Sequence, residues 1–275
     1  MDTRRILYIS QAISPYLPES NISNMSRFLP QWMLETGNEI RTFMPRFGCI
    51  NERRHQLHEV IRLSGINLII DDSDHPLIIK VASIQQARMQ VYFIDNEEYF
   101  HRKAIFKSPE GRFYNDNDER ITFFCRGVIE TVKKLGWAPD IIHCHGWFTS
   151  LLPMYIKKSY GDNPLFSNSK VIYSIYNDEF KGKMSKDFPH KAIFENINDE
   201  DVKSLSHASY DDMIDLAVSY SDAIVLDNTI KNDYAKKLAI NTDKPVLVGY
   251  EEETYIEQFS KFYNEVLESD PIFVE

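Results

Sequence analysis

The sequence predicts an α/β protein with a doubly wound, mostly parallel sheet. Three observations predict this class. Short apolar runs alternate along the chain with segments of helical periodicity. The segments between those runs are long enough for right-handed crossover helices, which connect parallel strands. The 275 residues, of which 43% are hydrophobic and 26% charged, suit one large folded domain rather than a disordered chain.

The first predicted unit is a strand, a helix and a second strand. Residues 6–10 form an apolar run that is typical of a buried strand. Residues 23–35 carry apolar side chains at helical spacing, and Gly37 follows them as a helix stop. Residues 39–44 form the next apolar run. The N-terminal part of the chain therefore predicts a β-α-β unit.

The middle of the chain is less regular. Turn signals separate four predicted strands, at residues 59–63, 67–70, 76–83 and 89–94. Strands this close together indicate an antiparallel β-hairpin inserted into the parallel sheet. Residues 99–118 contain Gly111 and a run of Asn and Asp residues, so a loop is expected there, and residues 119–135 have helical spacing.

After Gly136 the alternation of strands and helices becomes regular. Strands are predicted at residues 140–145, 170–175, 222–226 and 245–250, and helices at residues 149–158, 209–220, 229–238 and 251–267. Ligands of such sheets bind beyond the carboxyl ends of the strands. A site is therefore expected among the loops at residues 11–22, 146–148, 176–183 and 227–228.

Charge and cysteine content exclude several function classes. The net charge of −10 argues against a nucleic-acid partner, which favours a basic face. Cys49, Cys125 and Cys144 show no paired spacing, so we expect a reducing compartment and a cytoplasmic protein. No apolar stretch is long enough to span a bilayer and no signal peptide is evident, so no membrane partner is expected. The chain contains no P-loop and no dinucleotide fingerprint, and no cofactor is expected.

Several segments resemble a known family when they are taken in order. They are FLP at 28–30, GNEIR at 37–41, MPRFG at 44–48, DIIHCHGWFT at 140–149 and DAIVL at 222–226. This order resembles the N-terminal domain of bacterial glycogen synthases and plant starch synthases, from about residue 6 to residue 238. The resemblance implies the Rossmann-like first half of a GT-B glycosyltransferase. In that family the first domain holds the growing α-glucan, the second binds ADP-glucose or UDP-glucose, and transfer occurs in the cleft between them.

The first loop departs from the family pattern. The family has K-T-G-G-L there, in which glycines allow the backbone to approach the phosphates of the nucleotide sugar. The matching stretch here is PESNI at 18–22, which has neither glycine nor lysine, and Glu19 would repel a diphosphate. Ser20 and Asn21, at the predicted helix start, are candidate ligand-binding residues.

Two further motifs are altered. In the family's His-Asp-Trp-His run, Gly146 replaces the aspartate and Phe148 the second histidine, while His145 and Trp147 remain. Tyr176-Asn177 stands where the family has His-Asn, and that histidine contacts the donor sugar in the family. The resemblance makes His145 and Tyr176 the catalytic candidates, and His145, Trp147, Tyr176 and Asn177 ligand-binding candidates. His143 is interpreted as a satisfied core residue, and no metal site is expected from His143, Cys144 and His145, because no further ligands lie at a suitable spacing.

The resemblance also bears on domain organisation. Residues 1–243 correspond to the synthase N-terminal domain, and residues 244–275 supply one strand and one helix in place of a donor-binding domain. We expect that helix to pack back on the same domain through Tyr255, Phe259, Phe262, Tyr263 and Val266. The acidic run at 251–253 would lie at its N-terminus, where the helix dipole favours negative charge.

Three functions fit these observations. The favoured one is a non-catalytic α-glucan-binding or regulatory relative in glycogen metabolism. The second is an active glucosyltransferase, with ADP-glucose or UDP-glucose as substrate, completed by a partner chain. The third is a protein–protein interaction module, which would bind a glycogen-metabolism enzyme or a second copy of itself through the face where a donor domain docks.

Overall fold

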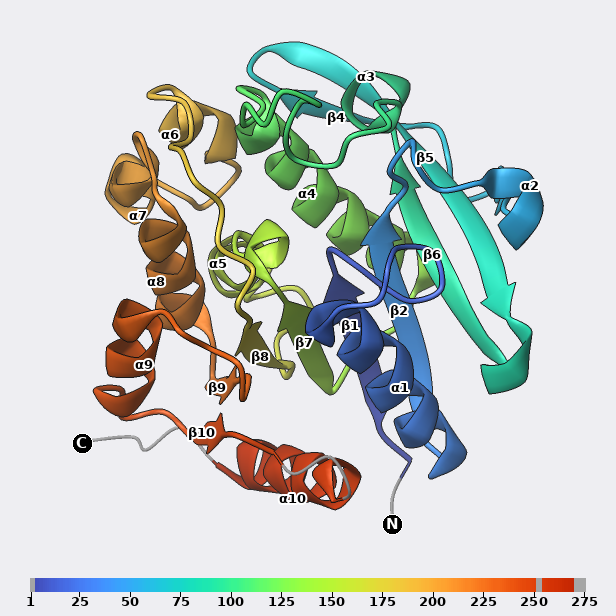
Figure 1. The fold of residues 1–275 in the computed structure, drawn as a ribbon, viewed down its shortest axis with the longest axis vertical. Coiled ribbons are helices and arrows are strands. Elements are labelled where there is room, and N and C mark those ends of the chain that lie inside the picture. Colours follow the sequence, from blue (N-terminus) through green and yellow to red (C-terminus); the bar gives the residue numbers. More distant parts are fainter. Residues whose placement is uncertain (1–2, 251–253, 270–275) are drawn as a thin grey trace.

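The computed structural model describes residues 3–250 and 254–269, and this part of the chain contains one ten-stranded sheet. The strand order is β10-β9-β8-β7-β1-β2-β6-β5-β3, with β4 paired to β5 (Figure 1). The strands are β1 (Arg5–Ser10), β2 (Glu39–Pro45), β3 (His58–Glu59), β4 (Ile66–Ile70), β5 (Ser73–Ile84), β6 (Met89–Asp95), β7 (Ile141–His145), β8 (Lys170–Ile175), β9 (Ala223–Leu226) and β10 (Val246–Val248). The strands from β10 to β6 are parallel, so the predicted doubly wound class is confirmed.

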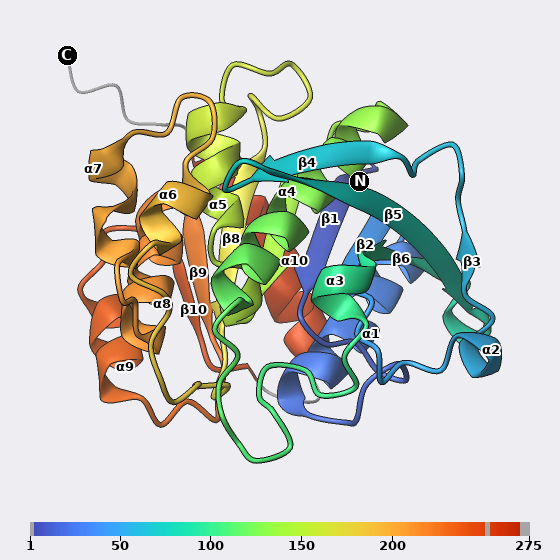
Figure 2. The ribbon, with the colours of Figure 1, turned by 90° about the horizontal axis from the view of Figure 1, so that it is seen from above.

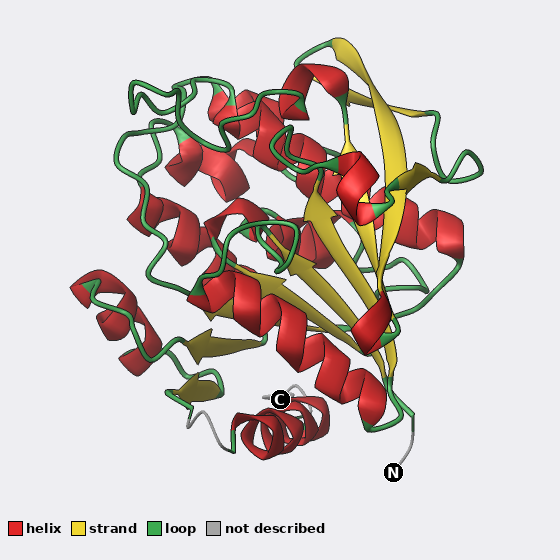
Figure 3. Ribbon diagram, turned by 45° about the vertical axis from the view of Figure 1, so that its right-hand side comes forward, coloured by secondary structure: helices red, strands yellow, loops and turns green. Residues whose placement is uncertain are grey.

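Helices cover both faces of the sheet (Figure 3). They are α1 (Asn21–Glu35), α2 (Glu52–His55), α3 (Glu97–Phe100), α4 (Asn117–Leu135), α5 (Leu152–Met154), α6 (Phe188–Ala192), α7 (Asp199–Val202), α8 (Tyr210–Tyr220), α9 (Asp233–Ile240) and α10 (Tyr255–Glu268). Along β1, Ile6 and Tyr8 pack toward α1 and α10, whereas Leu7 and Ile9 pack into the larger core under α4, α5 and α8. This alternation is that of a strand buried on both faces. No helix in the described ranges is both long and apolar enough to cross a membrane.

The antiparallel insertion is confirmed, with one error in its strands. β5 pairs antiparallel with β4 and with β6, and β4 and β5 lie at the outer edge of the molecule (Figure 2). The strand predicted at 59–63 is wrong, because β3 ends at Glu59. The backbone N–H of Leu63 donates to the Val60 carbonyl at 2.9 Å, which closes a turn, and Ile61 is 82% exposed. The turn brings β4 back beside β5.

Most predicted helices are confirmed, with shifted ends. α1 begins at Asn21 because Ser20 and Ser23 form a capping box, in which each side chain accepts a hydrogen bond from the backbone of the other residue. The helix predicted at 149–158 consists of three short pieces: a 3-10 turn at Trp147–Thr149, α5, and a π turn at Tyr155–Ser159. The short helices α2, α3, α6 and α7 were not predicted, because four or five residues are too few to show a period.

The helix α10 lies against the same face of the sheet as α1. Phe259, Phe262, Tyr263 and Val266 are buried there, in one cluster with Ile6 and Tyr8. The Tyr263 hydroxyl shares hydrogen bonds with the Tyr8 hydroxyl (3.0 Å) and with Nδ1 of His143 (2.7 Å).

The interpretation of His143 as a satisfied core residue is confirmed. Its second ring nitrogen, Nε2, bonds to Oγ of Ser174 at 2.7 Å, so both nitrogens have partners. Burial lowers the pKa of this ring well below 6.5, so it stays neutral. The acidic run at 251–253 lies outside the described residues.

The Tyr263 hydroxyl provides a test of how α10 is anchored. We expect Tyr263→Phe to lower the free energy of unfolding by about 1–3 kcal/mol, because two buried polar groups lose a partner. The control is Tyr234→Phe, which removes a 3.1 Å hydrogen bond to Asp215 at an exposed site and should cost less than about 0.5 kcal/mol. Urea unfolding measures both, and equal losses would contradict this account of the anchoring.

Candidate functional site

The carboxyl ends of β1 and β7 form the switch point of the sheet. These strands are neighbours, with Ser10 opposite His145, and the chain leaves them toward opposite halves of the sheet. Ligands of doubly wound sheets bind at this point. The loops at residues 11–22, 146–148, 176–183 and 227–228 converge around it, as the sequence predicts.

The side chain of Gln11 bridges two of these loops. Its Oε1 accepts the backbone N–H of Phe148 at 2.9 Å, and its Nε2 donates to Oδ2 of Asp178 at 2.9 Å. The same carboxylate oxygen accepts the backbone N–H of Trp147 at 3.3 Å, and Oδ1 accepts the Tyr210 hydroxyl at 3.0 Å. Burial raises the pKa of Asp178 from 3.8 to about 7, despite these donors.

Gly146 has no room for a side chain. Its φ of +81° lies in the left-handed region, and an added Cβ would lie 2.5 Å from Cδ1 of Ile22, 2.7 Å from Oε1 of Gln11 and 2.8 Å from Oδ2 of Asp178. The aspartate of the family motif therefore cannot occupy this position unless the Gln11–Asp178 pair moves. Oδ2 of Asp178, from the loop after the neighbouring strand β8, lies beside this position instead.

His145 and Tyr176, the two catalytic candidates, lie together beneath the loops. Nδ1 of His145 and the Tyr176 hydroxyl share a 2.7 Å hydrogen bond, and the residues are 0% and 3% exposed. Burial lowers the pKa of His145 to about 3, so the ring is neutral. Its Nε2 is buried and has no hydrogen-bond partner among the described residues. The His145 ring and the Tyr176 hydroxyl are thus both buried in the core.

Trp147 lies in an aromatic cluster rather than beside a pocket. Its ring is 1% exposed and lies 4.6 Å from the ring of Phe180 and 4.7 Å from that of Phe106, measured between centroids. Both the ring and the backbone N–H of Trp147 contact the loop at 176–183, the ring through Phe180 and the N–H through Asp178, but the ring does not line the pockets described below.

The remaining candidates line a shared pocket of about 450 Å³, here called the crevice pocket. Ser20 and Asn21 at the start of α1 face Tyr176 and Asn177 at the end of β8. The pocket is completed by Ile22, Asp178 and Thr229. Sequence analysis missed Gln11, Asp178 and Thr229 as site residues. The first two lie within the loops expected to hold a site, and Thr229 directly follows one.

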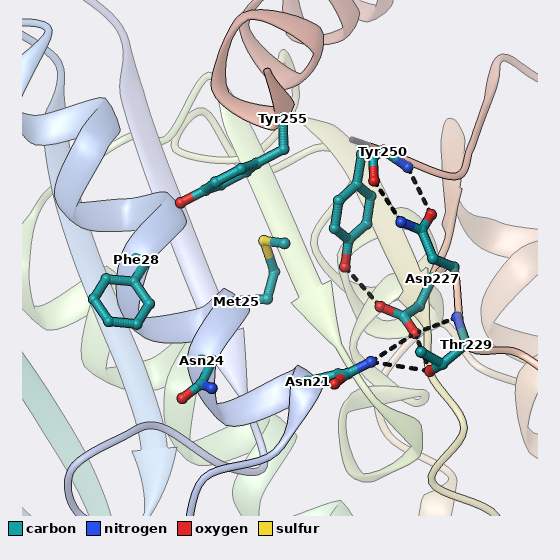
Figure 4. A pocket seen from close by; sticks show the side chains of 9 residues that line it. Asn21, Asn24, Met25, Phe28, Asp227, Thr229, Tyr250 and Tyr255 are labelled. Atoms are coloured by element: carbon teal, nitrogen blue, oxygen red, sulfur yellow. Dashed lines mark hydrogen bonds between the residues drawn. The ribbon is translucent and has the colours of Figure 1, made fainter. Parts of the chain in front are cut away.

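A second pocket of about 360 Å³ adjoins the first, and we call it the tyrosine pocket (Figure 4). It lies between α1, the loop after β9, Tyr250 and the first residue of α10, Tyr255. Its lining residues are Asn21, Asn24, Met25, Phe28, Asp227, Asn228, Thr229, Tyr250 and Tyr255. Asn21 and Thr229 belong to both pockets.

The electrostatic character of the two pockets is uniform. Within the described part of the chain, neither lining includes a lysine or an arginine, whereas each includes one aspartate, Asp178 or Asp227. The other polar groups are hydroxyls and amides. This lining suits a neutral ligand rich in hydroxyl groups better than an anion.

The crowding at Gly146 predicts a difference between two alanine variants. Gly37 also has a positive φ, +93°, but no atom lies within 4 Å of an added Cβ. Gly37→Ala should therefore cost only the backbone strain, about 1–2 kcal/mol. Gly146→Ala should cost about 1–3 kcal/mol more, because Gln11 and Asp178 must give up hydrogen bonds. Equal losses of unfolding free energy, measured in urea, would show that these side chains are free to move away.

The raised pKa of Asp178 predicts a pH-dependent contribution to stability. Between about pH 4 and pH 7 the folded protein holds a proton on Asp178 that the unfolded chain has lost, so this contribution falls as the pH rises through that window. Asp178→Asn cannot ionise. It should lose less unfolding free energy than the parent chain between about pH 5 and pH 8. Urea unfolding at both pH values checks this, and an equal or larger loss in the variant would contradict it.

Comparison with known proteins agrees with the geometry. A family model described as the starch synthase catalytic domain matches residues 5–242. The glycogen synthase of Chlorobium luteolum is 36% identical over 228 residues, which are 82% of this chain and 46% of that protein. The glycogen synthase of Chlorobium phaeobacteroides is 34% identical over 246 residues, 89% of this chain and 49% of that protein. The chain thus spans about half the length of the curated relatives it matches.

A solved structure shares the fold. It is the catalytic domain of starch synthase IV from Arabidopsis thaliana bound to ADP and acarbose, with a TM-score of 0.69 and 16% identity, covering 96% of this chain and 50% of that one. The family match, the glycogen synthase relatives and the parallel sheet lead to one conclusion. The chain belongs to the starch synthase catalytic domain family and is similar in sequence to glycogen synthases.

Proposed function

We propose that this domain binds an α-glucan chain in the crevice pocket and does not transfer glucose by itself, so that it serves glycogen metabolism as a binding or regulatory component. The observation that carries the proposal is the lining of the pocket, which offers Ser20, Asn21, Asn177 and Thr229 as uncharged polar groups and Asp178 as its one acid. An α-glucan is uncharged and presents hydroxyl groups that such side chains can bind. The starch synthase IV structure is bound to acarbose, a pseudo-oligosaccharide, as well as to ADP.

A nucleotide sugar is disfavoured at the same place. Its diphosphate needs cations or free backbone N–H groups. The loop before α1 has no lysine, and the backbone N–H of Ser23 is already bonded to Oγ of Ser20 at 3.2 Å in the capping box. The Asp178 carboxylate would repel a phosphate whenever it is ionised.

The geometry of the switch point supports the part of the proposal that denies transfer by this chain alone. Gly146 supplies no carboxylate where the family motif has one, and the space beside it is filled. The Tyr176 hydroxyl bonds to Nδ1 of His145, and Nε2 of His145, which has no partner among the described residues, is buried, so a sugar in the crevice pocket would reach neither ring's polar atoms without a rearrangement. Acid–base chemistry requires a group within hydrogen-bond reach of the reacting atoms.

A second candidate function is glucosyl transfer completed by another polypeptide, and one observation favours it. Oδ2 of Asp178 lies 2.8 Å from the point where a Cβ of residue 146 would be. A carboxylate thus returns to the region of the family's aspartate from the loop after β8. With a pKa of about 7, Asp178 is balanced between acid and base near neutral pH. In this alternative, the Asp178 carboxylate stands in for the aspartate that the family motif has at the position of Gly146.

The two candidates differ in binding and in turnover. Calorimetric titration with maltoheptaose, ADP-glucose and UDP-glucose should show binding of maltoheptaose alone. With labelled donor and glycogen, the chain should incorporate no label above a blank, while a complete two-domain synthase does so under the same conditions. Incorporation by the chain alone would contradict the first candidate. Incorporation that appears only when a second polypeptide is added, and that is lost in Asp178→Asn, would support the second.

Variants of the crevice pocket test where the glucan binds. Asn177→Ala should weaken maltoheptaose binding about threefold to tenfold, the effect of one lost hydrogen bond. Asn67→Ala is the matched control, because Asn67 is an exposed asparagine on β4, in the antiparallel insertion. Equal affinities of the two variants would place the glucan elsewhere.

A further inference from the structure

The tyrosine pocket has walls that the family match does not cover. Tyr250 and Tyr255 follow residue 242, the last position that the starch synthase model matches. The opposite wall is α1, with Asn24 and Phe28 (Figure 4). A volume of 360 Å³ lies within the usual range for ligand sites, about 300–1,000 Å³. The pocket therefore combines residues inside the matched region with Tyr250 and Tyr255 beyond it.

The side chains of this pocket combine aromatic rings with amides and a carboxylate. Phe28, Tyr250 and Tyr255 offer ring surfaces, and Asn21, Asn24 and Asp227 offer polar groups. A pyranose ring fits both kinds of group, because its C–H face packs on an aromatic ring while its hydroxyls bond to amides and carboxylates. Phe28 is 46% exposed, so its ring is open to a ligand in the pocket.

The polar part of the pocket is held in place before any ligand binds. Oδ2 of Asp227 accepts the Tyr250 hydroxyl at 2.6 Å, and Oδ1 accepts the backbone N–H of Thr229 at 2.9 Å. The backbone N–H of Tyr250 donates to Oδ1 of Asn228 at 2.7 Å, and Nδ2 of Asn228 donates to the Tyr250 carbonyl. Groups fixed in this way lose little freedom on binding, which favours affinity.

The two pockets adjoin and share part of their lining. Asn21 and Thr229 line both, and Nδ2 of Asn21 donates to the Thr229 hydroxyl at 3.0 Å. On the far side, Trp32 follows Phe28 by four residues on α1 and is 42% exposed, so the two rings lie on one face of the helix. Polar and aromatic groups therefore extend from the crevice pocket, through the tyrosine pocket, along α1.

We propose that the tyrosine pocket is a second sugar-binding subsite, which holds further glucose units of an α-glucan whose first units lie in the crevice pocket, and that Phe28 and Trp32 extend it as a stacking surface. This inference rests on the proposed function. It adds a specificity for chain length: a glucan long enough to reach Phe28 binds more tightly than a short one.

The experiment compares maltotriose with maltoheptaose by calorimetric titration. The parent chain should bind maltoheptaose at least tenfold more tightly, since each 1.4 kcal/mol of added contact is tenfold. Phe28→Ala should weaken maltoheptaose binding about threefold to tenfold and leave maltotriose binding unchanged. Tyr234→Ala is the matched control, because Tyr234 is a 42% exposed aromatic residue on α9 and does not line either pocket.

Tryptophan fluorescence gives a second measurement. Trp32 is exposed, whereas Trp137 and Trp147 are 7% and 1% exposed. Maltoheptaose should therefore change the emission of the parent chain through Trp32, and Trp32→Phe should remove that change. Maltotriose should leave the emission unchanged.

The outcomes separate this inference from the proposed function. If Phe28→Ala leaves maltoheptaose binding unchanged while Asn177→Ala weakens it, the proposed function stands and the second subsite is overturned. A parallel weakening of maltotriose by Phe28→Ala would overturn the order of the two subsites. If no glucan binds to the parent chain, both proposals fail together.

Discussion

The hydrogen bonds of the Asp178 carboxylate are the interaction on which the site depends. This one side chain accepts from Gln11 after β1, from the backbone of Trp147 after β7 and from Tyr210 on α8. It thereby joins the loops on both sides of the switch point. The arrangement requires a glycine at position 146, since a Cβ there would contact two members of the network. The glycine at position 146 and the position of Asp178 are thus parts of one structural solution.

The parallel half of the fold could be predicted because its strands are buried on both faces and appear as continuous apolar runs. The run at 170–175 coincides with β8. The strand predicted at 59–63 was wrong, because an apolar pattern does not show whether a neighbouring strand is there to pair with it. Ser20, Asn21 and Asn177 could be expected to lie close together, because loops at the carboxyl ends of parallel strands must meet, and they line one pocket. The role of Asp178 could not, because its partner Gln11 lies 167 positions away.

Sequence also could not show the direction in which a motif's side chains point. His145 and Trp147 occupy motif positions, yet one bonds to Tyr176 beneath the loops and the other packs against Phe180 and Phe106. Tertiary neighbours decide this, and α10 is among them. Through Tyr263 and His143, α10 is tied to β1, β7 and β8, and its first residue, Tyr255, forms a wall of the tyrosine pocket. The helix that completes the core thus also shapes a surface beside the crevice.

The chemistry of that surface is consistent from one pocket to the next: amides, hydroxyls and aromatic rings, with carboxylates as the charged groups. A neutral sugar chain suits it and a nucleoside diphosphate does not. The most direct test is a crystal structure of the chain soaked separately with maltoheptaose and with ADP-glucose. We expect glucose units beside Asn177 and Thr229 in the crystal soaked with maltoheptaose, and no nucleotide there in the crystal soaked with ADP-glucose. A diphosphate bound at Ser20 and Asn21, at the start of α1, would contradict it.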